Sequence, residues 1–175
     1  MVAEKTTLYA IDCRGRATVV SQGGPRVEGG IAVAPRSFSR FAGELIAPDE
    51  LSGRLFAFGP QGRVRLVVES GLPAGGDIGV EGVGFVPAGL GRRSAAYFAD
   101  LGAPGSPTEG SDSLLVLRGP DLARAGLQPG ELVAATESGA LTIAVHCATR
   151  CTVRRVAVGP ATAHGEGHVL FLPEG

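Results

Sequence analysis

Apolar positions along this chain fall in short runs, and segments that contain glycine or proline separate one run from the next. Two pairs of runs, 8–11 with 16–20 and 55–58 with 63–68, each flank a glycine-containing turn. Aromatic and β-branched residues on both sides of such a turn are typical of a β-hairpin. The pattern predicts antiparallel β-strands through most of the chain.

One stretch of this pattern occurs three times, as a glutamate, a glycine, a short apolar run and a proline. Recurrence of this kind is the signature of a repeat protein. The sequence therefore predicts a single domain, residues 1–175, of two to three β-repeats that begin near Glu28, Glu81 and Glu166. Because the apolar runs of these Glu-Gly strands are continuous, we expect inner strands that are buried on both faces.

A second segment of the repeat, residues 43–50, returns at 130–137. Each copy is followed by a Ser-Gly pair and a further apolar strand. The repeat unit therefore combines the Glu-Gly strand with three more strands, and the strands between 113 and 153 do not divide uniquely among the units.

Residues 120–126 depart from the strand pattern, because they begin with proline and end with glycine. Proline favours the first turn of a helix, and glycine favours the position just after its end. We expect one or two turns of helix near 120–126.

The charge balance is close to neutral, with a formal net charge of −1. The arginines are scattered singly or in pairs, so the sequence offers no basic patch for nucleic acid or an anionic membrane. We therefore expect neither nucleic acid nor a membrane as a partner, whereas a small-molecule ligand remains an alternative. Residues 1–6 contain no apolar signal segment, which predicts a cytoplasmic location, or an extracytoplasmic one if the chain belongs to a longer secreted protein.

The repeat resembles the blades of NHL-repeat and gluconolactonase-type (senescence-marker-protein-like) β-propellers. Those blades similarly run from a Glu-Gly stretch to a strand ending in aspartate, then a Leu-Tyr/Phe strand and a Gly-Arg-Val return. The resemblance covers most of the chain from Leu8 onward and implies an all-β fold of antiparallel, propeller-type blades. Two to three blades do not close a ring. The resemblance thus implies a partial propeller, a ring completed by self-association, or a sheet that closes in some smaller way.

In the gluconolactonase-type family, a glutamate of the Glu-Gly motif ligates a divalent metal, and an asparagine and an aspartate complete the site. The resemblance carries the glutamate ligand to Glu28, Glu81 or Glu166. This chain contains no asparagine, so it departs from the family's ligand set. We therefore expect first a binding or scaffold module with a structural divalent cation at the Glu-Gly strands. The alternative is a metal-dependent hydrolase of lactones or esters.

Two overlapping sets of side chains are candidates for that cation. Glu28, Glu81 and Glu166 share one position of the repeat, and clustered carboxylates suit calcium. His164 and His168 flank Glu166 at alternate positions, so on a regular strand all three share a face and suit zinc or another transition metal. The alternative interpretations are carboxylates that accept backbone hydrogen bonds at strand entries, and a polar strand edge.

Asp49 and Asp100 each close an apolar strand. Aspartates at such positions usually accept hydrogen bonds from turn amides, and a catalytic role is the alternative.

Cys147 and Cys151 flank a short hairpin loop, which makes a disulfide geometrically feasible. In a reducing compartment both would be free thiols. Cys13 has no partner in either case.

Overall fold

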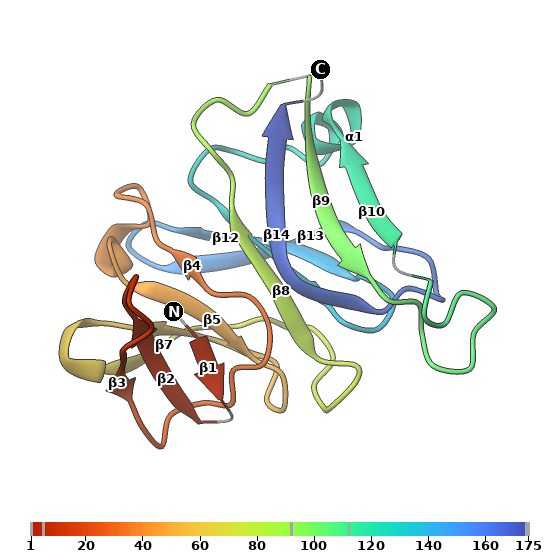
Figure 1. Ribbon diagram of the computed structural model, residues 1–175. Helices are drawn as coiled ribbons and strands as arrows, with labels where there is room; N and C mark the ends of the chain where they lie inside the picture. Colours follow the sequence, from red (N-terminus) through yellow and green to blue (C-terminus); the bar gives the residue numbers. More distant parts are fainter. Residues whose placement is uncertain (1, 5, 92, 112, 174–175) are drawn as a thin grey trace.

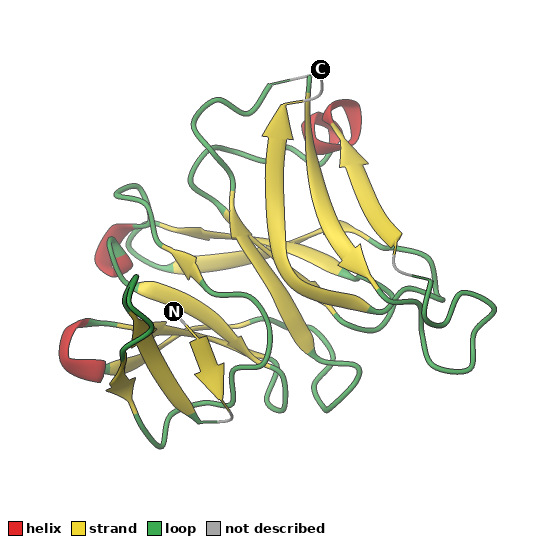
Figure 2. Cartoon of the chain, viewed as in Figure 1, coloured by secondary structure: helices red, strands yellow, loops and turns green. Residues whose placement is uncertain are grey.

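The computed structural model describes residues 2–4, 6–91, 93–111 and 113–173. It is an all-β structure with short helical segments (Figures 1 and 2). The strands are β1 (Val2–Glu4), β2 (Thr7–Ile11), β3 (Ala17–Ser21), β4 (Ala32–Val33), β5 (Leu45–Asp49), β6 (Arg54–Phe58), β7 (Val64–Glu69), β8 (Val80–Phe85), β9 (Ser94–Asp100), β10 (Ser113–Arg118), β11 (Leu132–Thr136), β12 (Thr142–Cys147), β13 (Cys151–Ala157) and β14 (Gly165–Pro173). The helical segments are η1 (Ser39–Phe41), η2 (Pro60–Gly62) and α1 (Gly119–Arg124).

The strands form three sheets, ordered β1-β2-β3, β4-β5-β6-β7 and β10-β9-β14-β8-β11-β12-β13. The seven-stranded sheet curls into a half-barrel. Its β14 and β8 run parallel to each other, whereas the other paired strands are antiparallel. The predicted all-β fold and both predicted hairpins, β2–β3 and β6–β7, are confirmed.

Buried apolar side chains of the described residues form three clusters that lie between successive sheet layers. The first cluster lies between β2–β3 and one face of β5–β6. The second lies between the other face of β5–β7 and the half-sheet of β8, β11 and β12. The third lies between the far face of β11–β12 and the half-sheet of β14, β9 and β10, with α1 against it. The curl of the long sheet thus lets its two halves face each other.

Side-chain alternation explains how the inner layers serve two clusters at once. In β5, Ile46 belongs to the second cluster and Ala47 to the first. In β11, Val133 belongs to the third cluster and Ala134 to the second. Each inner layer is therefore covered by apolar side chains on both faces.

The three Glu-Gly strands differ in burial. Strand β8 is buried along its length as expected, and its Phe85 packs edge-on against Phe38 with 4.9 Å between ring centroids. For β4 and β14 the expectation of burial on both faces is wrong, because Val33 is 63% and Leu170 57% exposed. Strand β8 lies inside the stack of layers, whereas one face of β14 has no layer over it.

The helix expected near 120–126 is present as α1, and Gly126 beyond it has a φ of +64°. Strands β11 to β13 extend the sheet from β8, while β10 pairs with β9. The strands between 113 and 153, which the sequence did not assign to repeat units, therefore lie in two different parts of the sheet. A disulfide joins Cys147 to Cys151 across the β12–β13 hairpin (S–S 1.99 Å). In the described part of the chain, no helix has the length and apolar character that crossing a membrane requires.

Candidate metal centre

The three Glu-Gly strands meet at backbone contact distance. The Gly30 amide donates to the carbonyl of Glu81 (3.0 Å), and β8 pairs with β14. A Cβ atom at Gly29 would lie 2.0 Å from Glu81 Cγ, and one at Gly84 would lie 2.0 Å from the Val169 carbonyl oxygen. The glycines of the motif are therefore required for these strands to touch.

This packing brings Glu28, Glu81 and Glu166 to the wall of one hollow of about 390 Å³. His168 also lines this hollow, together with apolar side chains of β9, β10 and β14. The structure thus gathers the three glutamates at one place.

A tighter cluster, which meets this hollow at Glu166, consists of Glu137, His164 and Glu166, whose potential ligand atoms all lie within 4.8 Å of one another. The imidazole Nε2 of His164 lies 2.8 Å from Glu137 Oε1 and 3.3 Å from Glu166 Oε1. Two carboxylates and one imidazole are a donor set that divalent metals accept.

Backbone hydrogen bonds hold the cluster between three segments of the chain. The Glu137 amide donates to the Gly79 carbonyl (2.8 Å), and the Gly165 amide donates to the Glu137 carbonyl (2.7 Å). The amide of His164 donates to Asp100 Oδ1 (2.9 Å). Gly79 directly precedes β8, and Gly165 is the first residue of β14. The backbone of Glu137 is therefore held between two Glu-Gly strands.

Asp100 acts here as a positioning residue. Its Oδ1 also accepts from the amide of Gly102 (3.0 Å), and its Oδ2 accepts from the hydroxyl of Ser113 (2.9 Å). These hydrogen bonds to the charged form lower the pKa of Asp100 against the opposing effect of burial. The expected structural role of this strand-ending aspartate thus extends to fixing the segment that presents His164.

Two carboxyl groups at this site are buried, and the carboxylates repel one another. Glu81 and Glu137 are each 5% exposed. Burial, a hydrogen bond with Glu166 and the negative charges of Glu166 and Glu137 raise the pKa of Glu81 to about 9. Burial, with the charges of Glu166 and Asp77, raises the pKa of Glu137 to about 7. Both groups therefore hold protons that ordinary glutamates lack at neutral pH.

A third buried carboxyl group, that of Glu50, lies between this site and Glu28. We call Glu50, Glu81 and Glu137 the carboxylate array. Glu50 is 3% exposed, and burial together with a hydrogen bond to Glu28 raises its pKa to about 7. The amide of Asp77 donates to its Oε1 (2.8 Å), but its Oε2 is buried without a hydrogen-bond partner among the described residues. Glu50 interacts electrostatically with both Glu28 and Glu137, so it links Glu28 to the cluster.

His168 does not join the cluster. Gly167 adopts a φ of +68°, and the register of β14 against β9 shifts between Glu166 and Val169. This bulge breaks the alternation on which the expected His164–Glu166–His168 face depends. The ring of His168 lies instead at Ile31, whose amide donates to Nε2 (3.3 Å).

Sequence reasoning missed Glu50 and Glu137, although a signal for both was present. They are the last residues of the two copies of the second repeat segment, 43–50 and 130–137. A carboxylate that recurs at one position of a repeat returns to one place in the fold. The repeat thus supplies a second set of recurring glutamates, Glu50 and Glu137, near those of the Glu-Gly strands.

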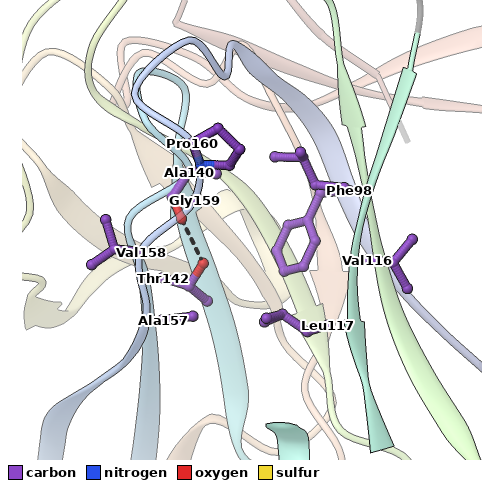
Figure 3. Close-up of a pocket in the computed structure, with 10 residues that line it drawn as sticks. Phe98, Val116, Leu117, Ala140, Thr142, Ala157, Val158, Gly159 and Pro160 are labelled. Atoms are coloured by element: carbon purple, nitrogen blue, oxygen red, sulfur yellow. Dashed lines mark hydrogen bonds between the residues drawn. The ribbon is translucent and has the colours of Figure 1, made fainter.

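A second hollow, of about 270 Å³, opens where β10 faces the end of β13 (Figure 3). Phe98 and Leu117 point into it from one side, and Pro160 and Ala157 border the other side. None of its described lining residues is ionisable. Of these two hollows, the first is the one whose described lining residues include ionisable groups. Comparison with protein families, with curated proteins and with solved structures finds no match to this chain.

Proposed function

We propose that this protein is a propeller-type β-module that binds a divalent cation through Glu137, His164 and Glu166. The observation that carries the proposal is the convergence of these three donors within 4.8 Å beside further buried carboxylates. The layered sheets are consistent with blades, since β4–β7 and β8 with β11–β13 are both four-stranded and both follow a Glu-Gly start.

The electrostatic cost of burying these carboxylates together supports the binding of a cation. Burying several carboxylates together is unfavourable unless protons or a cation neutralise them. Glu50 provides independent support, because its Oε2 is buried without a hydrogen-bond partner among the described residues. A divalent cation supplies the missing charge at Glu137, and the unfavourable interactions of Glu50 and Glu81 are reduced with it.

The donor set favours a transition metal over calcium. Calcium takes six to eight oxygen ligands, whereas imidazole suits zinc, iron and related ions. Of the two cations expected from the sequence, zinc fits the His164 imidazole better. Glu81 lies next to Glu166 and is a candidate for a further ligand.

The test is isothermal titration calorimetry of chelator-treated protein with Zn²⁺, Mn²⁺ and Ca²⁺. Glu137→Gln and His164→Gln remove ligands, and Glu69→Gln is the matched control because Glu69 pairs with Arg54 on the surface. We expect each ligand variant to lose more than about 10-fold in affinity, the lower bound for changes around a metal site. Equal affinity in Glu137→Gln and the control would contradict the proposal.

A hydrolase is the second candidate, because the hollow beside the cluster gives a ligand access to Glu166. Three protein ligands with an open position form a catalytic arrangement, in which the cation can activate a bound water. Hydrolysis of lactones or esters that requires zinc and is lost in His164→Gln would favour this candidate. Zinc binding without turnover would favour the binding module.

A further inference from the structure

The stack of sheet layers has two ends, and both present apolar side chains to solvent. Within the stack, every contact between successive layers is an apolar cluster of the described residues. The end layers, β1–β3 and β14-β9-β10, each use only one face in these clusters. Their outer faces are where another layer would continue the stack.

The outer face of β14-β9-β10 is the more apolar. Leu114, Leu170 and Leu172 are 63%, 57% and 51% exposed. Leu170 is directly opposite Tyr97 in the register of β14 with β9, so the two side chains share this face. We call Tyr97, Leu114, Leu170 and Leu172 the β14 end face.

The outer face of the β2–β3 hairpin is its counterpart at the other end. Tyr9 is opposite Val19 in the register, and Ile11 lies two residues further along the same face. Ile11 and Val19 are 47% and 46% exposed, whereas Leu8 points inward and is 2% exposed. We call Tyr9, Ile11 and Val19 the β2 end face.

We propose that copies of this chain associate head to tail, with the β14 end face of one copy packed on the β2 end face of the next. The contact would continue the sheet-on-sheet packing that the chain already makes between each pair of its own layers. Charge also favours this occupant. Glu166 borders the hollow beside the β14 end face, and Arg14 lies in the turn of the β2–β3 hairpin, whereas Arg16 and Glu28 already pair with Asp12 and Arg26 within the chain.

Because the two faces differ, the contact is heterologous, and repetition closes a ring when the rotation between copies allows it. Strand β14 already has β8 and β9 as hydrogen-bonded neighbours within the chain. The association therefore uses the face of this sheet, and the backbone of β14 is not its basis. It depends on no bound cation.

Light scattering coupled to size exclusion tests the proposal between about 1 and 100 μM, the range in which an interface of modest affinity dissociates. We expect the parent chain to form dimers or larger assemblies. Leu170→Glu and Val19→Glu each place a charge in one end face and should each yield monomers. Leu66→Glu is the matched control, because Leu66 is an exposed leucine (44%) of β7 outside both faces.

A mixture of the two monomeric variants gives the decisive result. Leu170→Glu keeps an intact β2 end face and Val19→Glu keeps an intact β14 end face, so the mixture should form heterodimers. Circular dichroism and thermal unfolding establish that both variants are folded, and Leu172→Glu replaces Leu170→Glu if the latter does not fold. A parent chain that stays monomeric at 100 μM overturns the proposal, as do variants that assemble like the control.

Discussion

Glu28 and Glu81 occupy the same position of the repeat, yet their environments shift their pKa values in opposite directions. Hydrogen bonds with Glu50 and Arg26 lower the pKa of Glu28, whereas burial and Glu166 raise that of Glu81. The residue two positions earlier accounts for much of the difference. Arg26 forms an ion pair with Glu28 (2.5 Å). At the equivalent position before Glu81 the chain has Gly79, which offers no positive charge and leaves room for Glu50 to approach the strand.

The third copy extends the comparison. Two residues before Glu166 the chain has His164, whose imidazole lies between two carboxylates. The position two residues before the glutamate is thus arginine, glycine or histidine in the three copies. Correspondingly, Glu28 is ion-paired, Glu81 is protonated and Glu166 is a potential metal ligand. The lesson is that a repeated motif fixes where a side chain lies, and its neighbours decide its chemistry.

The largest expected effect concerns the pH dependence of stability in cation-free protein. Glu81 keeps its proton up to a pKa of about 9 in the folded state, whereas the ordinary pKa of a glutamate is 4.5. The folded state therefore binds the extra proton between these values, so the contribution of Glu81 to stability is fully present below pH 4.5 and is lost as pH rises toward 9. The slope approaches about 1.4 kcal/mol per pH unit for one proton.

Urea unfolding between pH 5 and 9 checks this expectation. Glu81→Gln should lose the slope between pH 7 and 9, where Glu50 and Glu137, each with a pKa of about 7, contribute least. Glu28→Gln, at the equivalent repeat position, should keep it. A parent protein equally stable at pH 7 and 9 would refute this account of Glu81.

The next effect contrasts two Glu-Gly strands of unequal burial. Phe85→Ala on β8 should cost about 3 kcal/mol, because it leaves a cavity against Phe38. Val33→Ala on β4 should change the free energy of unfolding by less than about 0.5 kcal/mol, because Val33 is exposed. Chemical denaturation of both variants measures the difference, and equal losses would mean that β8 is not the buried copy.

The smallest effect contrasts two hairpins at the same place in the repeat. The β12–β13 hairpin is closed by the Cys147–Cys151 disulfide, and the β6–β7 hairpin by a hydrogen bond from Gly59 to Arg63 (2.8 Å). Because the disulfide closes a very short loop, its reduction should cost only about 2 kcal/mol. Thiol titration of unreduced, denatured protein should detect Cys13 alone, and three reactive thiols would rule the disulfide out.

Much of this fold could be predicted from the sequence because its determinants are local. Glycine turns between apolar runs identified the hairpins, and proline and glycine marked α1. The parallel pairing of β8 with β14 could not be predicted, since it joins residues far apart in the chain. Burial depends on whether another layer covers each face of a strand, which is why β8 matched the expectation and β14 did not.

The candidate site was predictable in part for the same reason. Its glutamates recur at one repeat position, which indicated that Glu28, Glu81 and Glu166 would lie together. The bulge at Gly167, which removes His168, depends on the packing of β14 against β9. The participation of Glu137 depends on backbone contacts with Gly79 and Gly165 that no local pattern reveals.

Proton release on cation binding tests the central claim most directly. Calorimetric titration of Zn²⁺ near pH 7 in buffers of different ionisation enthalpy counts the protons displaced. We expect about one proton or more per bound cation, because a cation at Glu137 and Glu166 replaces protons held by Glu137 and Glu81. Release should decrease in Glu81→Gln and stay unchanged in Glu28→Gln. Zinc binding without proton release, or no binding, would contradict a cation site at these carboxylates.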